Sequence, residues 1–246
     1  MLDSGNYNAA PVAIDKSVSI QAVPGAVASL VATNAITPGL AAQTPGVELS
    51  LRNIVFTSTQ AVGVGLRAWG VTLRLEGCAF HDLDYGLQAY GGSKVVVTDS
   101  TFTRVRTQLI QVEESTATIA RSRFVGNANG LLLNGPQATL SVEDSLFAFN
   151  TSGVEAVDIA AACQGPAKAF VVRSQFIGHS AYALTVQTYS GVAANAYIEM
   201  NGNVIVKNTF GVRFQAPGIV QSASNNRLMA SVTSDYYGPI TATASY

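Results

Sequence analysis

A phenylalanine that returns at nearly regular intervals is the feature that most constrains the fold of this chain. From residue 56 onward the successive gaps are 24, 22, 22, 23 and 29 residues, and Ile205 takes the next place after a further 29. The repeat positions are Phe56, Phe80, Phe102, Phe124, Phe147 and Phe176. A period of roughly 20 to 50 residues is typical of proteins whose units bury their apolar faces only against neighbouring units. We therefore expect residues 1–246 to form one solenoid domain.

Two short strands are predicted in each repeat. An alternating segment precedes each phenylalanine, at residues 49–51, 73–75, 95–97, 117–119, 140–142, 169–171 and 198–200. A period of two places the outer members of each triplet in the core and the middle one, such as Arg74 or Glu199, in solvent. A second strand follows the phenylalanine and usually begins at a glycine, as at Gly63 and Gly86. With no helical period, this pattern predicts an all-β protein, a parallel β-helix of about eight coils.

Stacked coils predict columns of matching side chains at the turns. Asn127, Asn150, His179 and Asn208 each lie three residues after a repeat position, and we expect them to form a hydrogen-bonded ladder. His179 is accordingly interpreted as a ladder member and not as a catalytic histidine. Opposite charges at equivalent positions of successive coils predict ion pairs. The expected pairs are Arg52–Glu76, Asp82–Arg104 and Asp84–Arg106.

Composition excludes several classes of partner. The chain has 14 Lys and Arg against 15 Asp and Glu, a formal net charge of −1, which gives no basic footprint for nucleic acid. No apolar run approaches the roughly 18 to 20 residues of a membrane span, so no membrane insertion is expected. The two cysteines, Cys78 and Cys163, are too few for a disulfide framework, and we do not expect them to be bridged.

Several segments resemble one known family. Residues 2–7 and 14–20, and the coil patterns at 51–56, 97–102 and 142–147, are similar to bacterial right-handed parallel β-helix repeat proteins of the pectate-lyase-like superfamily. The resemblance covers roughly residues 2–232 and implies a right-handed, single-stranded β-helix.

The resemblance and the repeat also carry expectations about the ends of the chain. Family members usually have a further segment before this point, so we expect a missing N-terminal segment and a secreted, periplasmic or cell-surface location, although residues 1–5 are no signal peptide. Residues 1–45 are expected to supply the first coils and an uncapped N-terminal edge through which copies self-associate. The irregular stretch 231–246 is expected to cap the other end.

The resemblance also implies a chemistry to look for. Enzymes on this scaffold mostly act on acidic polysaccharides, with Arg or Lys as the base and often Ca²⁺ held by Asp residues. The best local match is the cluster His81, Asp82, Asp84, Arg104 and Arg106. Each aspartate already has an arginine partner in the next coil, and the family's polygalacturonase and epimerase motifs do not occur. The sequence therefore predicts no metal site and favours a non-catalytic protein over an enzyme. A Ca²⁺-dependent polysaccharide lyase or other glycan-modifying enzyme is the alternative.

A binding strip is predicted on the second strands. Arg67, Trp69, Gln88 and Tyr90 share outward parity, with Tyr90 expected to align with Arg67. Aromatic and hydrogen-bonding side chains together suit the stacking of sugar rings, although a surface cation–π pair is the simpler interpretation of these residues. The insertion at 158–168 lengthens one coil beside this face but adds no catalytic cluster. The sequence thus favours a non-catalytic β-helix module, structural or polysaccharide-binding, with a trimeric phage tailspike-type segment as a second alternative.

Overall fold

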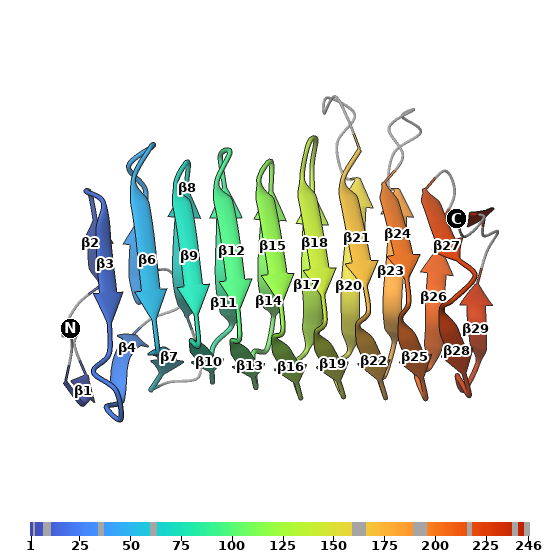
Figure 1. Ribbon diagram of the computed structural model, residues 1–246, viewed down its shortest axis with the longest axis horizontal. Helices are drawn as coiled ribbons and strands as arrows, with labels where there is room; N and C mark the ends of the chain where they lie inside the picture. Colours follow the sequence, from blue (N-terminus) through green and yellow to red (C-terminus); the bar gives the residue numbers. More distant parts are fainter. Residues whose placement is uncertain are drawn as a thin grey trace.

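The fold is a stack of parallel strands wound into coils. The computed structural model describes residues 1, 3–6, 11–33, 37–59, 63–158, 166–188, 196–215, 218–237 and 241–243. Within these residues there are 30 strands, which form three ten-stranded parallel sheets and step through them in threes. Three consecutive strands therefore complete one coil, and Figure 1 shows the coils stacked along the long axis from the N-terminus to the C-terminus. The predicted parallel β-helix is confirmed, with ten strands per sheet where about eight coils were expected.

The three sheets are numbered here by their first strand. Sheet 1 contains β1 (Gly5–Asn6), β4 (Ala28–Ala32), β7 (Ile54–Ser58), β10 (Ala79–His81), β13 (Thr101–Thr103), β16 (Arg123–Val125), β19 (Leu146–Ala148), β22 (Gln175–Ile177), β25 (Val204–Val206) and β28 (Arg227–Met229). Sheet 2 contains β2 (Val12–Ile14), β5 (Leu40–Ala42), β8 (Val64–Trp69), β11 (Tyr85–Tyr90), β14 (Gln108–Glu113), β17 (Asn129–Asn134), β20 (Ser152–Asp158), β23 (Tyr182–Thr188), β26 (Phe210–Phe214) and β29 (Ser234–Tyr237). Sheet 3 contains β3 (Val18–Gln21), β6 (Glu48–Arg52), β9 (Thr72–Glu76), β12 (Lys94–Thr98), β15 (Thr116–Ala120), β18 (Thr139–Glu143), β21 (Lys168–Val172), β24 (Tyr197–Asn201), β27 (Ile219–Ala223) and β30 (Thr241–Thr243).

The repeated phenylalanines form one column in the core, from sheet 1. All six rings are completely buried, and each stacks on the next with centroids 4.5 to 5.0 Å apart. Leu30 precedes the column and Ile205 and Leu228 follow it in the same register. The spacing equals that of the strands, so one ring per coil fills the interior continuously. The repeat that defines the sequence is therefore a packing repeat.

The predicted asparagine ladder is confirmed at the turns between sheets 1 and 2. The backbone amide of Asn127 donates to Asn150 Oδ1 at 2.9 Å. The backbone amide of Asn150 donates to His179 Nδ1 at 3.2 Å, and the backbone amide of His179 donates to Asn208 Oδ1 at 2.9 Å. Because His179 Nδ1 is an acceptor, its proton lies on Nε2, which is buried and has no hydrogen-bond partner. Burial lowers the pKa of His179 to about 4, so the imidazole is neutral at ordinary pH.

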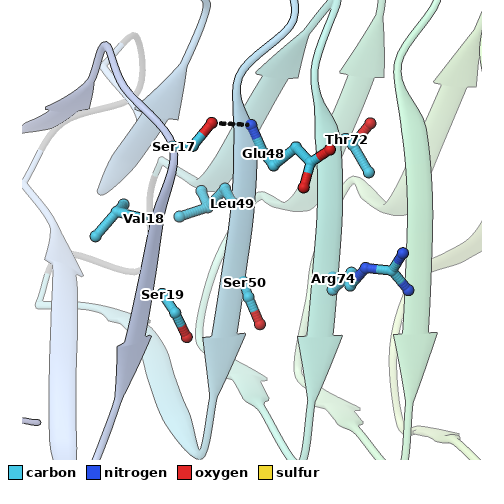
Figure 2. Close-up of a pocket in the computed structure, with 8 residues that line it drawn as sticks. All are labelled: Ser17, Val18, Ser19, Glu48, Leu49, Ser50, Thr72 and Arg74. Carbon is cyan, nitrogen blue, oxygen red and sulfur yellow. Dashed lines mark hydrogen bonds between the residues drawn. The ribbon is translucent and has the colours of Figure 1, made fainter.

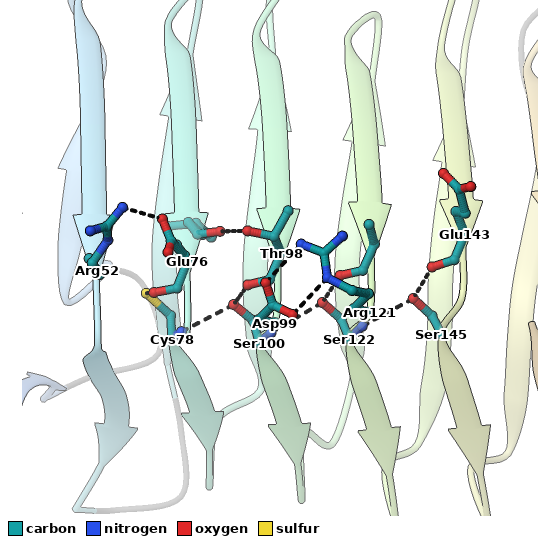
Figure 3. Close-up of polar contacts among 12 residues, drawn as sticks. Arg52, Glu76, Cys78, Thr98, Asp99, Ser100, Arg121, Ser122, Glu143 and Ser145 are labelled. Carbon is teal, nitrogen blue, oxygen red and sulfur yellow. Dashed lines mark hydrogen bonds and ion pairs between the residues drawn. The ribbon is translucent and has the colours of Figure 1, made fainter.

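A second ladder runs along the turns between sheets 3 and 1, where Cys78 takes the position that serine occupies in the following coils. The backbone amide of Cys78 donates to Ser100 Oγ at 3.1 Å, and those of Ser100 and Ser122 each donate to the serine of the following coil at 3.2 Å (Figure 3). The backbone amide of Ser145 continues the ladder to Ser174 Oγ at 3.2 Å. A hydroxyl one coil away thus satisfies each buried amide that the strands leave unpaired.

Charged pairs follow the same turn on its exposed side. Arg52 donates to Glu76 at 2.5 Å, which confirms that predicted pair, and Arg121 donates to Asp99 with two bonds of 2.9 Å (Figure 3). The Cys78 thiol is free and buried, and burial raises its pKa to about 11, so it is protonated at neutral pH. Cys163 lies outside the described residues.

The C-terminal stretch differs from the expectation of an irregular segment. β29 and β30 extend sheets 2 and 3 by one strand each, so the described part of 231–246 continues the solenoid. The alternation that would have revealed these strands is weak because each has only three or four residues. The insertion predicted at 158–168 falls largely on residues 159–165, outside the described part. No helix among the described residues is long and apolar enough to cross a membrane.

Candidate functional site

The outward face of sheet 2 carries the predicted binding strip. In β8 the side chains of Leu66 and Ala68 are completely buried, whereas Arg67 and Trp69 point outward. Strand pairing places Gln88 beside Arg67, and Tyr90 beside Trp69. The expected alignment of Tyr90 with Arg67 is therefore wrong by two residues. Gly65 lies nine residues after Phe56, whereas Gly86 lies six after Phe80, so three extra residues precede β8, and Gly65, not Gly63, is equivalent to Gly86.

Hydrogen bonds join the polar members of this strip from strand to strand. Arg67 Nε donates to Gln88 Oε1 at 3.0 Å, and Gln88 Nε2 donates to Gln111 Oε1 at 3.4 Å. Tyr90 OH donates to the same Gln111 oxygen at 3.1 Å, and Gln111 Nε2 reaches Glu113 at 3.4 Å. Burial and the nearby Glu113 carboxylate raise the pKa of Tyr90, so its hydroxyl keeps its proton. Gln111, which sequence reasoning did not single out, follows Gln88 in register on the next strand of sheet 2.

Trp69 is the exposed aromatic side chain of the strip. Half of its surface is open to solvent, and its ring lies 6.0 Å from that of Tyr90 at a tilt of 41°. The indole lies directly over Gly91, where an added Cβ would come within 2.8 Å of the ring. Gly91 also has φ +60°, so both its conformation and its lack of a side chain allow the ring to lie there. The exposed ring is held in place, as a stacking surface requires.

The same outward column continues into a more enclosed region toward the C-terminus. Gln111 is followed in register by Leu132, then Glu155, Thr185 and Arg213. Strand alternation alone could have predicted the last three, because Val154-Glu155-Ala156 and Leu184-Thr185-Val186 share one pattern. Sequence reasoning missed them because they match no catalytic motif.

Contacts among these C-terminal side chains are polar. Gln187 Nε2 donates to Glu155 Oε1 at 2.8 Å, and Arg213 donates to Tyr182 OH at 2.8 Å with its guanidinium 4.7 Å from the ring centroid. Thr185 is 1% exposed, and its hydroxyl oxygen has no hydrogen-bond partner. Burial raises the pKa of Glu155, an effect that Arg213 partly opposes.

The predicted catalytic cluster lies at the turns between sheets 1 and 2. Arg104 donates to both oxygens of Asp82, at 2.7 and 2.8 Å, and Arg106 donates to Asp84 at 3.1 Å. His81 Nδ1 lies 2.9 Å from Asp82. The Arg104 guanidinium holds the pKa of the Asp82 carboxyl well below its usual range. Both predicted ion pairs are confirmed, and an arginine held by a carboxylate is poorly suited to remove a proton from a substrate.

Other parts of the surface offer less. A shallow hollow of about 310 Å³ lies on sheet 3, and Figure 2 shows its eight lining residues. Ser19, Ser50 and Arg74 point outward there in one register, and the one hydrogen bond drawn joins the Glu48 amide to Ser17 Oγ at 3.0 Å. The lining lacks an aromatic ring and a carboxylate pair. In the described part of the chain, no group of three or more His, Cys, Asp or Glu residues is placed to hold a metal ion.

Comparison with known proteins decides the family. Residues 40–210 match the family model described as the right handed beta helix region. The chain belongs to this right-handed β-helix family. No curated protein matches the β-helix by sequence.

Solved structures that are similar to the chain have low sequence identity to it. The catalytic domain of a GH87 alpha-1,3-glucanase in complex with tetrasaccharides is 12% identical with a TM-score of 0.49, over 98% of this chain and 62% of that one. An endo-xylogalacturonan hydrolase from Aspergillus tubingensis is 10% identical with a TM-score of 0.45, over 96% and 92%. Tailspike protein 3 of bacteriophage CBA120 is 11% identical with a TM-score of 0.45, over 89% and 45%. The β-helix thus spans about three fifths of the glucanase domain.

Proposed function

We propose that this β-helix is a secreted or cell-surface, non-catalytic module that binds carbohydrate on the outward face of sheet 2. One observation carries the proposal: the half-exposed Trp69 ring is fixed over Gly91 beside a hydrogen-bonded chain of polar side chains. Protein sites for sugars need a flat aromatic surface for the apolar face of the ring and polar groups for its hydroxyls. The strip supplies both on adjacent strands.

The polar groups of the strip suit hydroxyl ligands. Gln88 and Gln111 each have an amide that donates and accepts, Glu113 accepts, and Tyr90 keeps a hydroxyl proton. These side chains already restrain one another through hydrogen bonds, so little conformational freedom is lost when a ligand binds. A rigid solenoid keeps them at the strand spacing.

The lyase alternative has less support. Its arginines, Arg104 and Arg106, are both engaged by aspartates at the turn, and neither lies on the face that carries the aromatic strip. A non-catalytic module follows more directly from the contacts of the described residues.

The test compares aromatic variants in glycan binding. A glycan array with the wild-type protein identifies a bound glycan, and calorimetric titration then compares wild type, Trp69→Phe and Trp69→Ala. We expect Trp69→Ala to weaken binding about tenfold and Trp69→Phe to retain most of it, because the phenyl ring preserves stacking. Phe149→Ala is the matched control, since Phe149 is 66% exposed but lies at a turn away from this strip.

Two results would contradict the proposal. Unchanged binding by Trp69→Ala would remove the strip as the site. Release of unsaturated products from polyuronates by the wild-type protein, detected by ultraviolet absorbance, would show that the module is an enzyme.

A further inference from the structure

Thr185 presents a buried hydroxyl that has no hydrogen-bond partner among the described residues. It points to the outer side of β23, is 1% exposed, and its Oγ1 has no hydrogen-bond partner. Buried polar atoms without partners are rare because the desolvation of such a group is uncompensated. The hydroxyl therefore calls for a partner from outside the chain.

The two neighbours of Thr185 in the column carry opposite charges. Glu155 lies one strand before it and Arg213 one strand after it, each about 4.8 Å away along the axis. Thr185 is the short side chain between two long ones, so its hydroxyl forms the floor between a carboxyl group and a guanidinium. Glu155 and Arg213 are both partly exposed, so a ligand that approaches this column meets them before it meets Thr185.

The donor and acceptor pattern favours a neutral ligand. The carboxylate accepts, the guanidinium donates, and the hydroxyl does both, while the two charges cancel. An anion would be repelled by Glu155. An ammonium group donates three hydrogen bonds and accepts none, so it needs several acceptors. Glu155, the charged acceptor here, already accepts one hydrogen bond from Gln187. Two adjacent hydroxyls, each donating and accepting once, match the set best.

We propose that Glu155, Thr185 and Arg213 form a second glycan-binding site, which takes a vicinal diol of a neutral sugar. The inference rests on the proposed function, because it assigns the class of glycan to the same face of sheet 2. It differs from the acidic polysaccharides that the family resemblance implies. The site lies five strands along sheet 2 from Trp69, roughly 24 Å away, so the two sites can be removed separately.

Calorimetric titration with neutral tetrasaccharides of glucose, galactose and mannose, and with tetragalacturonate, tests this site. We expect at least one neutral tetrasaccharide to bind more tightly than tetragalacturonate. Thr185→Val should weaken that binding about tenfold, whereas Thr185→Ser, which keeps the hydroxyl, should stay within about threefold. Because Thr185 Oγ1 has no partner in the protein, Thr185→Val should also leave the melting temperature unchanged or raise it by about 2 °C.

The outcomes separate this inference from the proposed function. Preference for tetragalacturonate, absence of binding by every neutral tetrasaccharide, or wild-type affinity in Thr185→Val would overturn the second site. If Trp69→Ala loses binding while Thr185→Val does not, the result supports the aromatic strip as the binding site and contradicts the second site. The reverse result retains the second site and removes the strip.

Discussion

The inner and outer columns of the β-helix follow opposite rules. Inside sheet 1, six successive coils place the same completely buried phenylalanine at the same position. On the outer face of sheet 2, one column changes at nearly every strand. Its members are Arg67, Gln88, Gln111, Leu132, Glu155, Thr185 and Arg213.

This difference separates the side chains that stabilise the fold from those whose identity changes from coil to coil. A column of like side chains at the strand spacing fills the core without voids, so each coil supports the next. The outer column contributes less to packing, because most of its side chains are partly exposed. Uniform columns therefore indicate stability, and varied columns with organised polar contacts are the places to look for binding.

Truncation of the inner column should have the largest effect on stability. Phe124 stacks between Phe102 and Phe147 with centroids 5.0 and 4.5 Å away, so Phe124→Ala leaves a cavity lined by rings on both sides. We expect a loss of about 3 to 5 kcal/mol in the free energy of unfolding, measured by urea denaturation.

Phe149→Ala is the matched control for that variant. Phe149 lies in the same stretch of chain but is 66% exposed, with its ring against Gly178. Its truncation should change the free energy of unfolding by no more than about 0.5 kcal/mol. Equal losses in the two variants would show that the phenylalanine column does not dominate stability.

Acid should weaken the turn ladder at His179. The pKa of His179 is about 4 in the folded protein and about 6.5 in an unfolded chain, so the unfolded state binds the extra proton first. The contribution of neutral His179 is fully present above pH 6.5 and is lost as the pH falls through 4. A difference of this size amounts to roughly 3 kcal/mol, measurable by denaturation at a series of pH values.

His179→Asn isolates this effect from other titrating groups. The asparagines at Asn150 and Asn208 donate their side-chain amides to the carbonyls of Phe124 and Phe176, a bond that the imidazole does not make. His179→Asn should therefore be as stable as wild type at pH 7.5, or about 1 kcal/mol more stable, and should lose the acid sensitivity between pH 6.5 and 4. Identical pH profiles for the two proteins would contradict the assignment of His179 to the ladder.

Sequence periodicity predicted the interior because packing imposes it. Phe56 and its equivalents, the Asn127 ladder and the Asp82–Arg104 pair all depend on residues one coil apart, and a repeat of known length aligns such residues. The outer strip was placed correctly on sheet 2, but its register was wrong by two residues. The chain between Phe56 and β8 is three residues longer than the chain between Phe80 and β11, and no side-chain pattern marks the difference.

The contacts in the C-terminal part of the outer column were not predicted. The partners of Glu155 and Arg213 depend on which long side chains meet above the sheet, and strand alternation gives only their direction. Likewise, the missing partner of Thr185 is a property of its surroundings and has no counterpart in the sequence.

The most direct test of the account maps glycan contacts on the whole protein. Backbone amide chemical shifts, recorded while the tightest-binding neutral tetrasaccharide is added to the ¹⁵N-labelled chain, report which residues meet the sugar. We expect chemical-shift changes confined to sheet 2, around Trp69 and Gln111 in β8 to β14 and around Thr185 in β20 to β26. Shifts centred on the Asp82 turn or on the hollow at Ser50, with sheet 2 unchanged, would contradict the claim that the varied outer column is the binding face.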